Sequence, residues 1–350
     1  MSRAPAVISL FSGCGGMDLG FVQAGFRVVW ANDTDGEARR IHGLNLPGGI
    51  YAGDIREADP GDIPDADVLT GGFPCQPFSS SGKRLGVEDP RGLLYLEAMR
   101  VIRAKRPGCV LLENVPGIIA ARMPDGRSVA DAIAEDLRRE GYDAEYAVLN
   151  AADYGVPQLR KRVFFLGVRG AFPSFPPKVR GCPGAAQTLG AILPVPPDVP
   201  DQDVIRLERA TALIVPHIPA GGSWKDVPDR YLPQRFLRMR GDMRLYHSPK
   251  FFRRVARTEI CRTVTANGRP DKGCNIHPTE DRCFSVREYA RIQSFPDSFR
   301  FPALPGRIPS MYRVIGNAVP PLLARRLAEH ILKTHVRPEP GVGLRRNRLF

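Results

Sequence analysis

The first 170 residues alternate between short β-rich runs and helix-like stretches, and this alternation limits the possible folds more than any other feature of the chain. Apolar runs occur at 6–11, 28–31, 67–70, 109–112 and 162–168, and helix-like segments occur at 17–24, 36–42, 94–105 and 128–140. Such alternation is typical of a mostly parallel sheet covered by helices on both faces. We therefore predict a doubly wound, Rossmann-like α/β domain with functional loops at the carboxyl ends of its strands.

The composition changes after residue 170. Residues 171–200 contain eight prolines, which excludes a regular helix or a central strand there. We predict a linker interrupted by one short helix at 188–193. A helix over 285–293 is predicted from Ser285 as N-cap and Glu288 at the capping-box position, and an amphipathic helix follows at 321–334.

The charge is distributed unevenly along the chain. Residues 1–170 hold 20 basic and 22 acidic side chains, whereas residues 171–350 hold 30 and 15. Ten basic and two acidic residues lie within 230–262, interleaved with aromatic residues. This pattern indicates a polyanion-binding module beside a module that performs chemistry. A solvated arginine-rich surface is the alternative, and charge alone does not decide between them.

The sequence contains no run of about 18 apolar residues and no signal-peptide pattern at its start. Its seven cysteines are scattered without a CxxC pair, so we expect reduced thiols and a cytoplasmic location. Cys261, Cys274, His277 and Cys283 could be drawn as a zinc site. Because no CxxC knuckle is present, we predict that no metal is bound.

A glycine-rich turn, residues 12–16, follows the first predicted strand. Asp18 stands where a dinucleotide-binding loop has its third glycine, and a carboxylate there would repel a pyrophosphate. Asp33, at the end of the second strand, is placed to accept ribose hydroxyls. Asp54 follows the next short segment and could meet an adenine amino group. We predict an adenosine-type ligand without phosphates, although a turn of this kind alone can be purely structural.

Four side chains capable of chemistry follow strand ends. Cys75 lies between two prolines beyond the third strand, and Glu113 directly follows four apolar residues. Arg160 and Arg162 point to the same side if their segment is extended. An acid beside an apolar run is costly unless it is paired or functional. The side chains therefore form either a Glu–Arg ion pair at a sheet edge or a pocket that joins a thiol, an acid and two guanidiniums.

Six motifs carry a resemblance to a known family. They are FSGCGGMDLGF, GGFPCQPFS, LLENV, YGVPQLRKRVFFLG, SVREYARIQSFPDSF and IGNAVPPLLA. In type and order they resemble those of DNA (cytosine-5)-methyltransferases of the bacterial and phage type. The resemblance spans about residues 1–170 and 275–335.

The resemblance implies a domain plan. A catalytic and cofactor-binding domain would occupy 1–170, an inserted target-recognition domain 171–284, and a segment returning to the catalytic domain 285–336. A disordered basic tail would occupy 337–350. The implied substrate is a specific sequence of double-stranded DNA, with S-adenosylmethionine as methyl donor. A cognate restriction endonuclease is an implied functional partner, and we expect a monomer.

The same resemblance assigns roles to single residues. Cys75 would attack carbon 6 of a flipped-out cytosine, Glu113 would act on ring N3, and Arg160 and Arg162 would hold the base oxygen and the thiolate. The implied cofactor residues are Phe11, Gly13, Gly15, Leu19, Asp33, Asp54, Ile55, Pro74, Leu94, Asn317 and Val319. The candidate DNA contacts are Gln158, Arg235, Arg238, Arg240, Arg244, Arg253 and Arg254.

Three alternative functions remain at the level of sequence. The first is an RNA cytosine-5 methyltransferase of the same fold, which the large basic insertion disfavours. The second is a DNA-binding relative without activity, which the presence of Cys75, Glu113 and Arg162 disfavours. The third is a nicotinamide oxidoreductase, which Asp18 and the prolines around Cys75 disfavour.

Overall fold

The computed structural model describes residues 3–51, 53–74, 94–123, 125–242, 252–266 and 275–336. The chain divides into two compact units. Unit 1 comprises Met1–Gly155, Arg160–Cys182 and Ala318–Phe350, and unit 2 comprises Val156–Leu159 and Pro183–Asn317. The polypeptide passes into unit 2 at 156–159, returns to unit 1 for 160–182, forms the rest of unit 2 at 183–317 and then returns to unit 1.

Unit 1 is built on a seven-stranded sheet with the strand order β3-β2-β1-β4-β5-β8-β6. Its strands are β1 (Ala6–Leu10), β2 (Arg27–Asn32), β3 (Ile50–Tyr51), β4 (Val68–Gly71), β5 (Cys109–Asn114), β6 (Asp143–Asn150) and β8 (Lys161–Val168). Neighbours from β3 to β5 pair in parallel, and β8 runs antiparallel to both β5 and β6. The predicted doubly wound, mostly parallel sheet is confirmed.

The central strands are mostly apolar because helices cover both of their faces. All residues of β1, β4 and β5 are buried. β6, at the sheet edge, alternates between buried and exposed positions, and for this reason its sequence lacks the continuous apolar run that marks the other strands. It was not predicted from the sequence.

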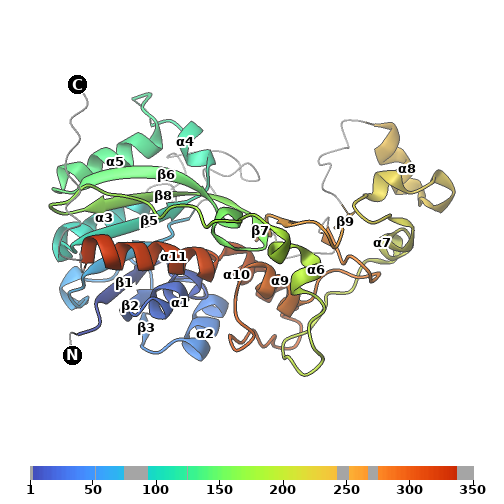
Figure 1. The fold of residues 1–350 in the computed structure, drawn as a ribbon, viewed down its shortest axis with the longest axis horizontal. Helices are drawn as coiled ribbons and strands as arrows, with labels where there is room; N and C mark the ends of the chain where they lie inside the picture. The colour runs from blue at the N-terminus through green and yellow to red at the C-terminus, as the bar shows by residue number, and fades with distance from the viewer. Residues whose placement is uncertain are drawn as a thin grey trace. The chain divides into compact units, whose positions relative to one another are not determined.

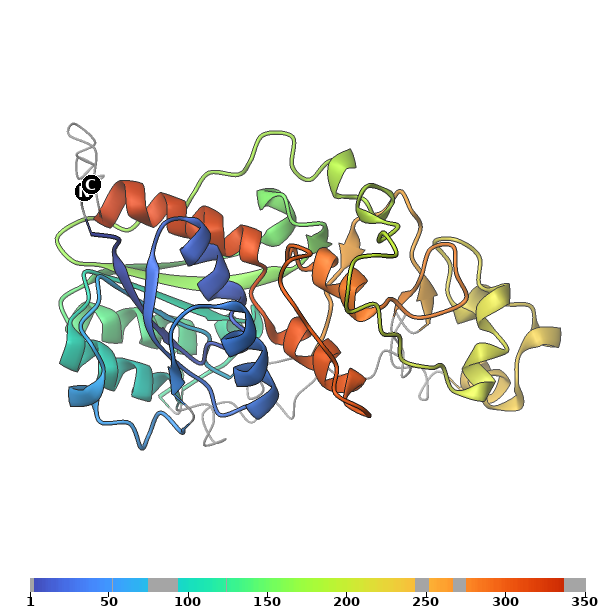
Figure 2. The ribbon, with the colours of Figure 1, turned by 90° about the horizontal axis from the view of Figure 1, so that it is seen from below.

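Helices of unit 1 form layers against the sheet (Figures 1 and 2). They are α1 (Gly16–Gln23), α2 (Gly36–Asn45), α3 (Leu94–Lys105), α4 (Gly117–Ala120), α5 (Val129–Arg139) and α11 (Pro321–Ile331). Apolar side chains of α3 and α5 join those of β1, β4 and β5 in one core cluster. α11 lies alongside α1 (Figures 1 and 2).

The approach of α11 to α1 is close enough to require a glycine. A Cβ at Gly20 of α1 would stand 2.5 Å from the Cβ of Ala324 and 2.6 Å from the carbonyl oxygen of Pro321. The sequence motif that ends in VPPLLA thus completes unit 1, as the sequence predicts for a returning C-terminal segment.

Unit 2 has a core of its own. Trp224, Phe236 and Phe252 are buried together with aliphatic residues around them. Its helices are α6 (Leu189–Ile192), α7 (Arg209–Ala212), α8 (Gln234–Gly241), α9 (Val286–Ile292) and α10 (Ile308–Asn317). Its short strands pair as β7 (Gln158–Leu159) with β10 (Cys261–Arg262) and as β9 (Arg253–Arg254) with β11 (Asn275–Ile276). The predicted capping box of Ser285 and Glu288 is present at the start of α9.

The boundaries of the two units differ from the predicted domain boundaries. Residues 171–182 belong to unit 1, and residues 285–317, expected in the returning segment, belong to unit 2. Tyr154 explains part of the difference, because its hydroxyl donates to the carbonyl of Pro176 and thereby attaches the proline-rich segment to unit 1. The predicted tail at 337–350 lies outside the described residues.

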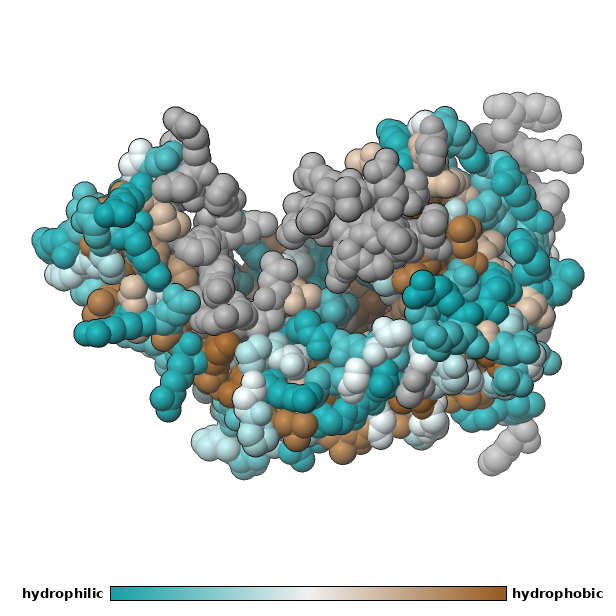
Figure 3. All heavy atoms as spheres, turned by 180° about the vertical axis from the view of Figure 1, so that it is seen from behind, coloured by the Kyte–Doolittle hydropathy of each residue, from teal (hydrophilic) through white to brown (hydrophobic). Residues whose placement is uncertain are grey.

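The surface shown in Figure 3 is mostly hydrophilic, with hydrophobic side chains in small groups. None of the described helices is both long enough and apolar enough to cross a membrane.

Candidate active site

The glycine-rich turn after β1 adopts a left-handed backbone. Phe11, Gly13 and Gly15 have φ angles of 53°, 58° and 89°. Glycine takes such angles without a steric cost, whereas a residue with a side chain is strained there. At Gly15 a Cβ would also lie 2.3 Å from Cδ1 of Leu46. The turn is therefore specified both by its backbone angles and by the helix packed beneath it.

The turn is anchored to the end of β2. The Oδ2 atom of Asp33 accepts the backbone N–H of Gly13 at 2.8 Å, and its Oδ1 atom accepts the N–H of Asp35 at 2.8 Å. A carboxylate oxygen can accept two hydrogen bonds, so this anchoring is compatible with a ribose hydroxyl as a further donor. The structure brings Gly13 and Asp33 together, as the sequence suggested.

Asp54 and Ile55 follow β3. Ile55 is 1% exposed and packs in the core cluster that Phe11 and Leu94 border. Arg56 donates to both carboxylate oxygens of Asp54, at 3.0 and 2.5 Å, and these bonds hold the pKa of Asp54 below its usual value. The Arg56 side chain is 61% exposed, and an exposed pair of this kind contributes little stability. Sequence reasoning missed Arg56.

Asp18 is oriented differently from the sequence-based expectation. Its carboxylate is buried, accepts the hydroxyl of Ser9 at 2.5 Å, and lies 2.8 Å from Nε2 of His42. It thus joins β1, α1 and α2 beneath the turn. The inference that this carboxylate faces and repels a pyrophosphate was wrong, because the side chain is buried in unit 1 and interacts with Ser9 and His42 there.

The remaining predicted cofactor residues occupy several elements. Leu19 is half-buried on α1, Leu94 is half-buried at the start of α3, and Pro74 is half-buried after β4. Val319 is buried in unit 1, whereas Asn317 is the last residue of α10 and belongs to unit 2.

Glu113 and Arg162 form a nearly buried ion pair. The Nε atom of Arg162 lies 2.9 Å from Oε1 of Glu113, and the two side chains are only 13% and 11% exposed. The pairing of β5 with β8 sets this contact, because Glu113 stands opposite Phe164 and Arg162 lies two residues along the same face of β8.

Burial raises the pKa of Glu113, and the positive charges of Arg162 and Arg160 oppose the rise without cancelling it. A carboxyl group in this environment retains a proton at higher pH than an exposed one does. It can therefore donate a hydrogen bond or a proton to a neutral ring nitrogen, which an ordinary glutamate at neutral pH cannot do.

Arg160 occupies a more structural position than Arg162. It is 1% exposed, and its Nη2 atom donates to the carbonyl oxygen of Ala318 at 3.0 Å. Arg160 therefore ties the strand segment to the start of the returning C-terminal chain within unit 1. Its charge still reaches Glu113.

The segment that leads from β4 toward Cys75 runs beside Glu113. A Cβ at Gly72 would stand 3.5 Å from Oε2 of Glu113 and 3.9 Å from the carbonyl oxygen of Phe11. Asn114 holds the same segment, because its Nδ2 atom donates to the carbonyl of Phe73 at 3.1 Å. Cys75 lies outside the described residues, so its role stays a prediction.

Other cysteines are unsuited to nucleophilic chemistry. Cys14 and Cys109 are buried, and burial raises the pKa of each thiol to about 12. They are core residues.

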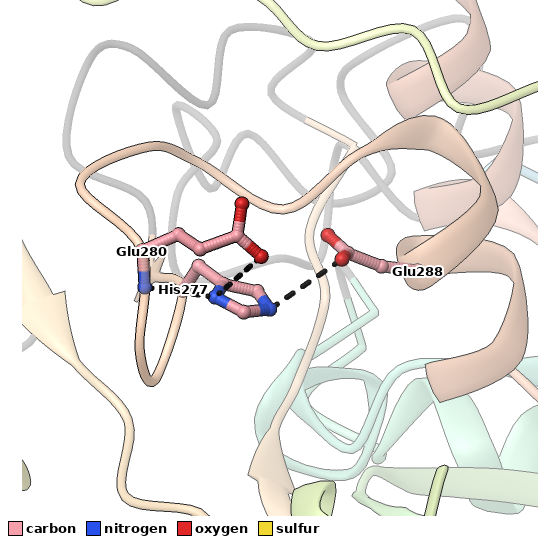
Figure 4. A group of neighbouring side chains, drawn as sticks. All are labelled: His277, Glu280 and Glu288. Carbon is pink, nitrogen blue, oxygen red and sulfur yellow. Dashed lines mark hydrogen bonds and ion pairs between the residues drawn. The ribbon is translucent and has the colours of Figure 1, made fainter. Parts of the chain in front are cut away.

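His277 lies with Glu280 and Glu288 (Figure 4), and Cys274 of the hypothetical zinc site lies outside the described residues. Its Nδ1 atom accepts the backbone N–H of Glu280 at 3.1 Å, and its Nε2 atom lies 3.4 Å from Glu288. Arg282 donates to the carboxylates of both Glu280 and Glu288. Burial, followed by the charges of Arg282 and Arg254, lowers the pKa of His277, opposed by Glu288 and Glu280. Arginine thus supplies the positive charge in this group.

Two predicted DNA contacts are corrected by the structure. Gln158 is fully buried, and its amide bonds Gln293 and the backbone of Val264. Arg254 is 6% exposed and donates to Asp281 and to four backbone carbonyls, those of Val215, Ile218, His277 and Glu280. Both side chains form their hydrogen bonds within unit 2, so neither is available to a nucleic acid in this conformation.

The other arginines of that set differ in availability. Arg240 is bonded to Asp229 and to three backbone carbonyls, and Arg253 is paired with Glu259. Arg235 forms an exposed pair with Glu208. Arg238 is exposed on α8, and the structure gives it no ion pair among the described residues. Arg244 lies outside the described residues.

Together, the sheet order, the glycine turn with Asp33 and the buried Glu113–Arg162 pair define a methyltransferase of the Rossmann-like class. The model of the family described as C-5 cytosine-specific DNA methylase matches residues 6–333. The chain belongs to this family. It is a DNA (cytosine-5)-methyltransferase that uses S-adenosylmethionine as methyl donor.

Relatives of the chain agree with this assignment. The type II methyltransferase M.NgoFVII of Neisseria gonorrhoeae is 37% identical over 342 residues, which cover 95% of this chain and 87% of the relative. M.PspPI of Psychrobacter sp. (strain TA137), also a type II methyltransferase, is 36% identical, with 95% and 80% covered.

Solved structures share the fold. A crystal structure of an E. coli prophage protein, described as a DNA modification methyltransferase, is 26% identical with a TM-score of 0.65, covering 94% of this chain and 99% of that one. The Dnmt2 methyltransferase of S. pombe has a TM-score of 0.67 at 21% identity, covering 94% and 98%. The predicted family, fold class, enzyme class and cofactor are confirmed.

Proposed function

We propose that this enzyme methylates a cytosine flipped out of a specific double-stranded DNA sequence, by way of a covalent bond between Cys75 and carbon 6 of the base. The observation that carries the proposal is the buried Glu113. Its carboxyl group has a raised pKa, is held by Arg162, and lies beside Gly72, three residues before the cysteine.

The residues divide the chemistry as follows. The Cys75 thiolate forms a bond to carbon 6, and the electron pair of the carbon 5–carbon 6 double bond moves into the ring, where Glu113 donates a proton to N3. Arg162 holds Glu113 and stabilises negative charge near the base. S-adenosylmethionine, when bound, supplies the electrophilic methyl group that carbon 5 accepts. Loss of the proton on carbon 5 to water, cleavage of the sulfur–carbon bond and return of the N3 proton to Glu113 then restore the aromatic ring, the free thiolate and the protonated acid.

The cofactor fits the residues at the carboxyl ends of the first three strands. A left-handed glycine turn lets a ligand approach the backbone, and Asp33 presents a carboxylate at the place where ribose hydroxyls are bound in folds of this type. We propose that Phe11, Gly13, Asp33 and the Asp54–Ile55 segment hold the adenosine portion.

The exposed cations of unit 2 are the proposed contacts to the DNA backbone. Arg238 and Arg235 lie three residues apart on α8 and are both exposed, so they share one face of that helix. Phosphate contacts of this kind provide affinity and offset the cost of flipping a base, while base-edge contacts provide the sequence preference.

Bisulfite sequencing of host DNA after expression tests the proposal. The wild type should protect one cytosine within a fixed sequence, whereas Cys75→Ala should bind DNA but leave every cytosine unprotected. Full methylation by Cys75→Ala would refute the covalent mechanism. Methylation found in RNA and absent from DNA would refute the substrate.

The biological setting follows from the type II relatives. We propose that the enzyme acts in the bacterial cytoplasm as a monomer, because one active site processes one strand at a time. A restriction endonuclease that cleaves the unmethylated form of the same sequence is the proposed functional partner. Digestion of host DNA before and after expression, with the endonuclease specific for the site found by bisulfite sequencing, tests whether methylation protects it.

A further inference from the structure

Asn32 connects two loops that the cofactor assignment treats separately. It is the last residue of β2, it is 0% exposed, and it pairs with Tyr51 of β3. Its Oδ1 atom accepts the backbone N–H of Phe11 at 3.1 Å, and its Nδ2 atom donates to the carbonyl oxygen of Gly53 at 3.0 Å. One side chain thus bridges the turn after β1 and the segment that enters Asp54 after β3.

The main chain of Asn32 strengthens the first of these connections. Its carbonyl oxygen accepts both the N–H of Ser12, at 2.9 Å, and the hydroxyl of Ser12, at 3.1 Å. The carboxylate of the next residue, Asp33, accepts the N–H of Gly13. The end of β2 therefore fixes three consecutive backbone amides of the turn, those of Phe11, Ser12 and Gly13.

The amide group is the chemical reason for asparagine at this position. An amide carries an acceptor and a donor on one short planar group, and Phe11 N–H requires the acceptor while the Gly53 carbonyl requires the donor. An aspartate would satisfy the first and place an anion against the second. An aliphatic side chain would leave both backbone groups buried without a partner.

Phe11 shows why the bridge matters to the site. Its φ angle of 53° is unusual for a residue with a side chain, and such a conformation persists only where neighbouring groups enforce it. The hydrogen bond from its N–H to Asn32 is one of the contacts that enforce it. Without that bond the turn is free to relax away from the conformation that presents Phe11.

We infer that Asn32 is a positioning residue that holds the two adenosine-binding loops, Phe11–Gly13 and Gly53–Ile55, at their working separation. The inference rests on the proposed assignment of these loops to the cofactor. Asn32 touches neither the base nor the reacting atoms in this scheme. It sets the shape of the cofactor site through the backbone.

The test compares Asn32→Asp with Asn45→Asp. Asn45 is half-buried at the end of α2 and donates to the carbonyl of Ile41, so the control adds the same charge in the same unit at a position outside the two loops. Calorimetric titration of each folded protein with S-adenosylmethionine, in the absence of DNA, gives the Kd. Steady-state methylation of a duplex substrate gives kcat and the KM for the cofactor.

For Asn32→Asp we expect the Kd and KM for S-adenosylmethionine to rise about 10- to 100-fold. The reason is that the substitution replaces the hydrogen bond to the Gly53 carbonyl by repulsion between two oxygens. We expect kcat at saturating cofactor and the affinity for DNA alone to stay near wild type. Asn45→Asp should change the cofactor Kd by less than about twofold, as typical surface substitutions do.

A folded Asn32→Asp protein that binds the cofactor like the wild type would overturn the inference, and so would an equal loss of kcat and DNA affinity with unchanged KM. If circular dichroism shows Asn32→Asp to be unfolded, Asn32→Ala replaces it, because it adds no charge. Unfolding of both would assign Asn32 to the fold alone and also overturn the inference. Failure of the proposed function would give a different result, because the wild-type enzyme itself would then show no Cys75-dependent methylation of DNA.

Discussion

Arg162→Ala should destabilise unit 1, and the loss should depend on pH. The substitution removes the guanidinium that lies 2.9 Å from Glu113 and leaves a carboxylate in a site where its side chain is 11% exposed. Removing one partner of a buried pair costs about 3–5 kcal/mol when the other partner stays charged. Because this pair keeps some solvent contact, we expect a loss of about 2–4 kcal/mol at pH 8.5.

The sign of the pH dependence follows from Glu113. Burial already raises the pKa of this carboxyl group in the folded protein, so the folded state binds more protons than the unfolded state between the unfolded and folded pKa values. Stability therefore falls as the pH rises through that window. Without Arg162 the folded pKa rises further and the window widens. Toward pH 4.5 a growing fraction of the carboxyl groups in the folded variant is protonated, and the loss should shrink toward about 1 kcal/mol, the usual value of one hydrogen bond.

Urea unfolding followed by Trp30 fluorescence measures this effect. The chain has two tryptophans, so a Trp224→Phe background confines the signal to unit 1. In that background, Arg162→Ala, Glu113→Gln and the double variant form a cycle, and we expect a coupling of about 1.5–3 kcal/mol at pH 8.5. Equal losses at pH 4.5 and pH 8.5, or a coupling below about 0.5 kcal/mol, would refute the view that Arg162 compensates a buried carboxylate.

Three further predictions concern the cofactor turn and unit 2. Gly15→Ala should lower stability by about 1–3 kcal/mol and weaken S-adenosylmethionine binding in calorimetry. The control Gly25→Ala has a similar φ of 93° and nothing within 4 Å of its Cβ, so it should leave cofactor binding intact. Equal effects of the two substitutions would show that the contact with Leu46 does not matter. Arg254→Met should lower the free energy of unfolding in urea by about 2–4 kcal/mol, because it leaves buried carbonyls unsatisfied. Arg238→Ala should keep that free energy within about 0.5 kcal/mol of wild type and weaken duplex binding. The reverse pattern would contradict the division into structural and exposed arginines. DNA affinity should fall steeply as salt rises, and a flat dependence in fluorescence anisotropy would show that the basic surface does not contact phosphates.

The strongly apolar parts of unit 1 were predictable from the sequence. The runs at 6–11, 67–70 and 109–112 correspond to β1, β4 and β5, because a strand buried on both faces is predominantly apolar. The helix at 94–105 was predicted with its observed bounds. The edge strand β6 and the helix α8 were missed, since both have a solvated face and neither has a long apolar run.

The site residues were proposed from motifs and strand positions, which do not predict the contacts between their side chains. An ion pair between Glu113 and an arginine was one of the two arrangements predicted from the positions of these residues on or beside strands, and the structure contains the Glu113–Arg162 pair. Nothing in the local sequence shows that Asp18 turns inward to His42, since the two are separated by 24 residues and meet only when α1 and α2 pack. Arg254 and Arg238 are likewise indistinguishable in a basic stretch, because their difference lies in which carbonyls the fold brings near them.

The packing of α11 against α1 sets an order of events during synthesis. The glycine turn and α1 leave the ribosome long before α11, so the surface around Gly20 acquires its partner only when Pro321 and Ala324 have been made. A nascent chain that already contains Cys75, Glu113 and all of unit 2 therefore still lacks α11, the helix that packs against α1 in unit 1. The packing of unit 1 is therefore completed only after the residues of unit 2 have been synthesised.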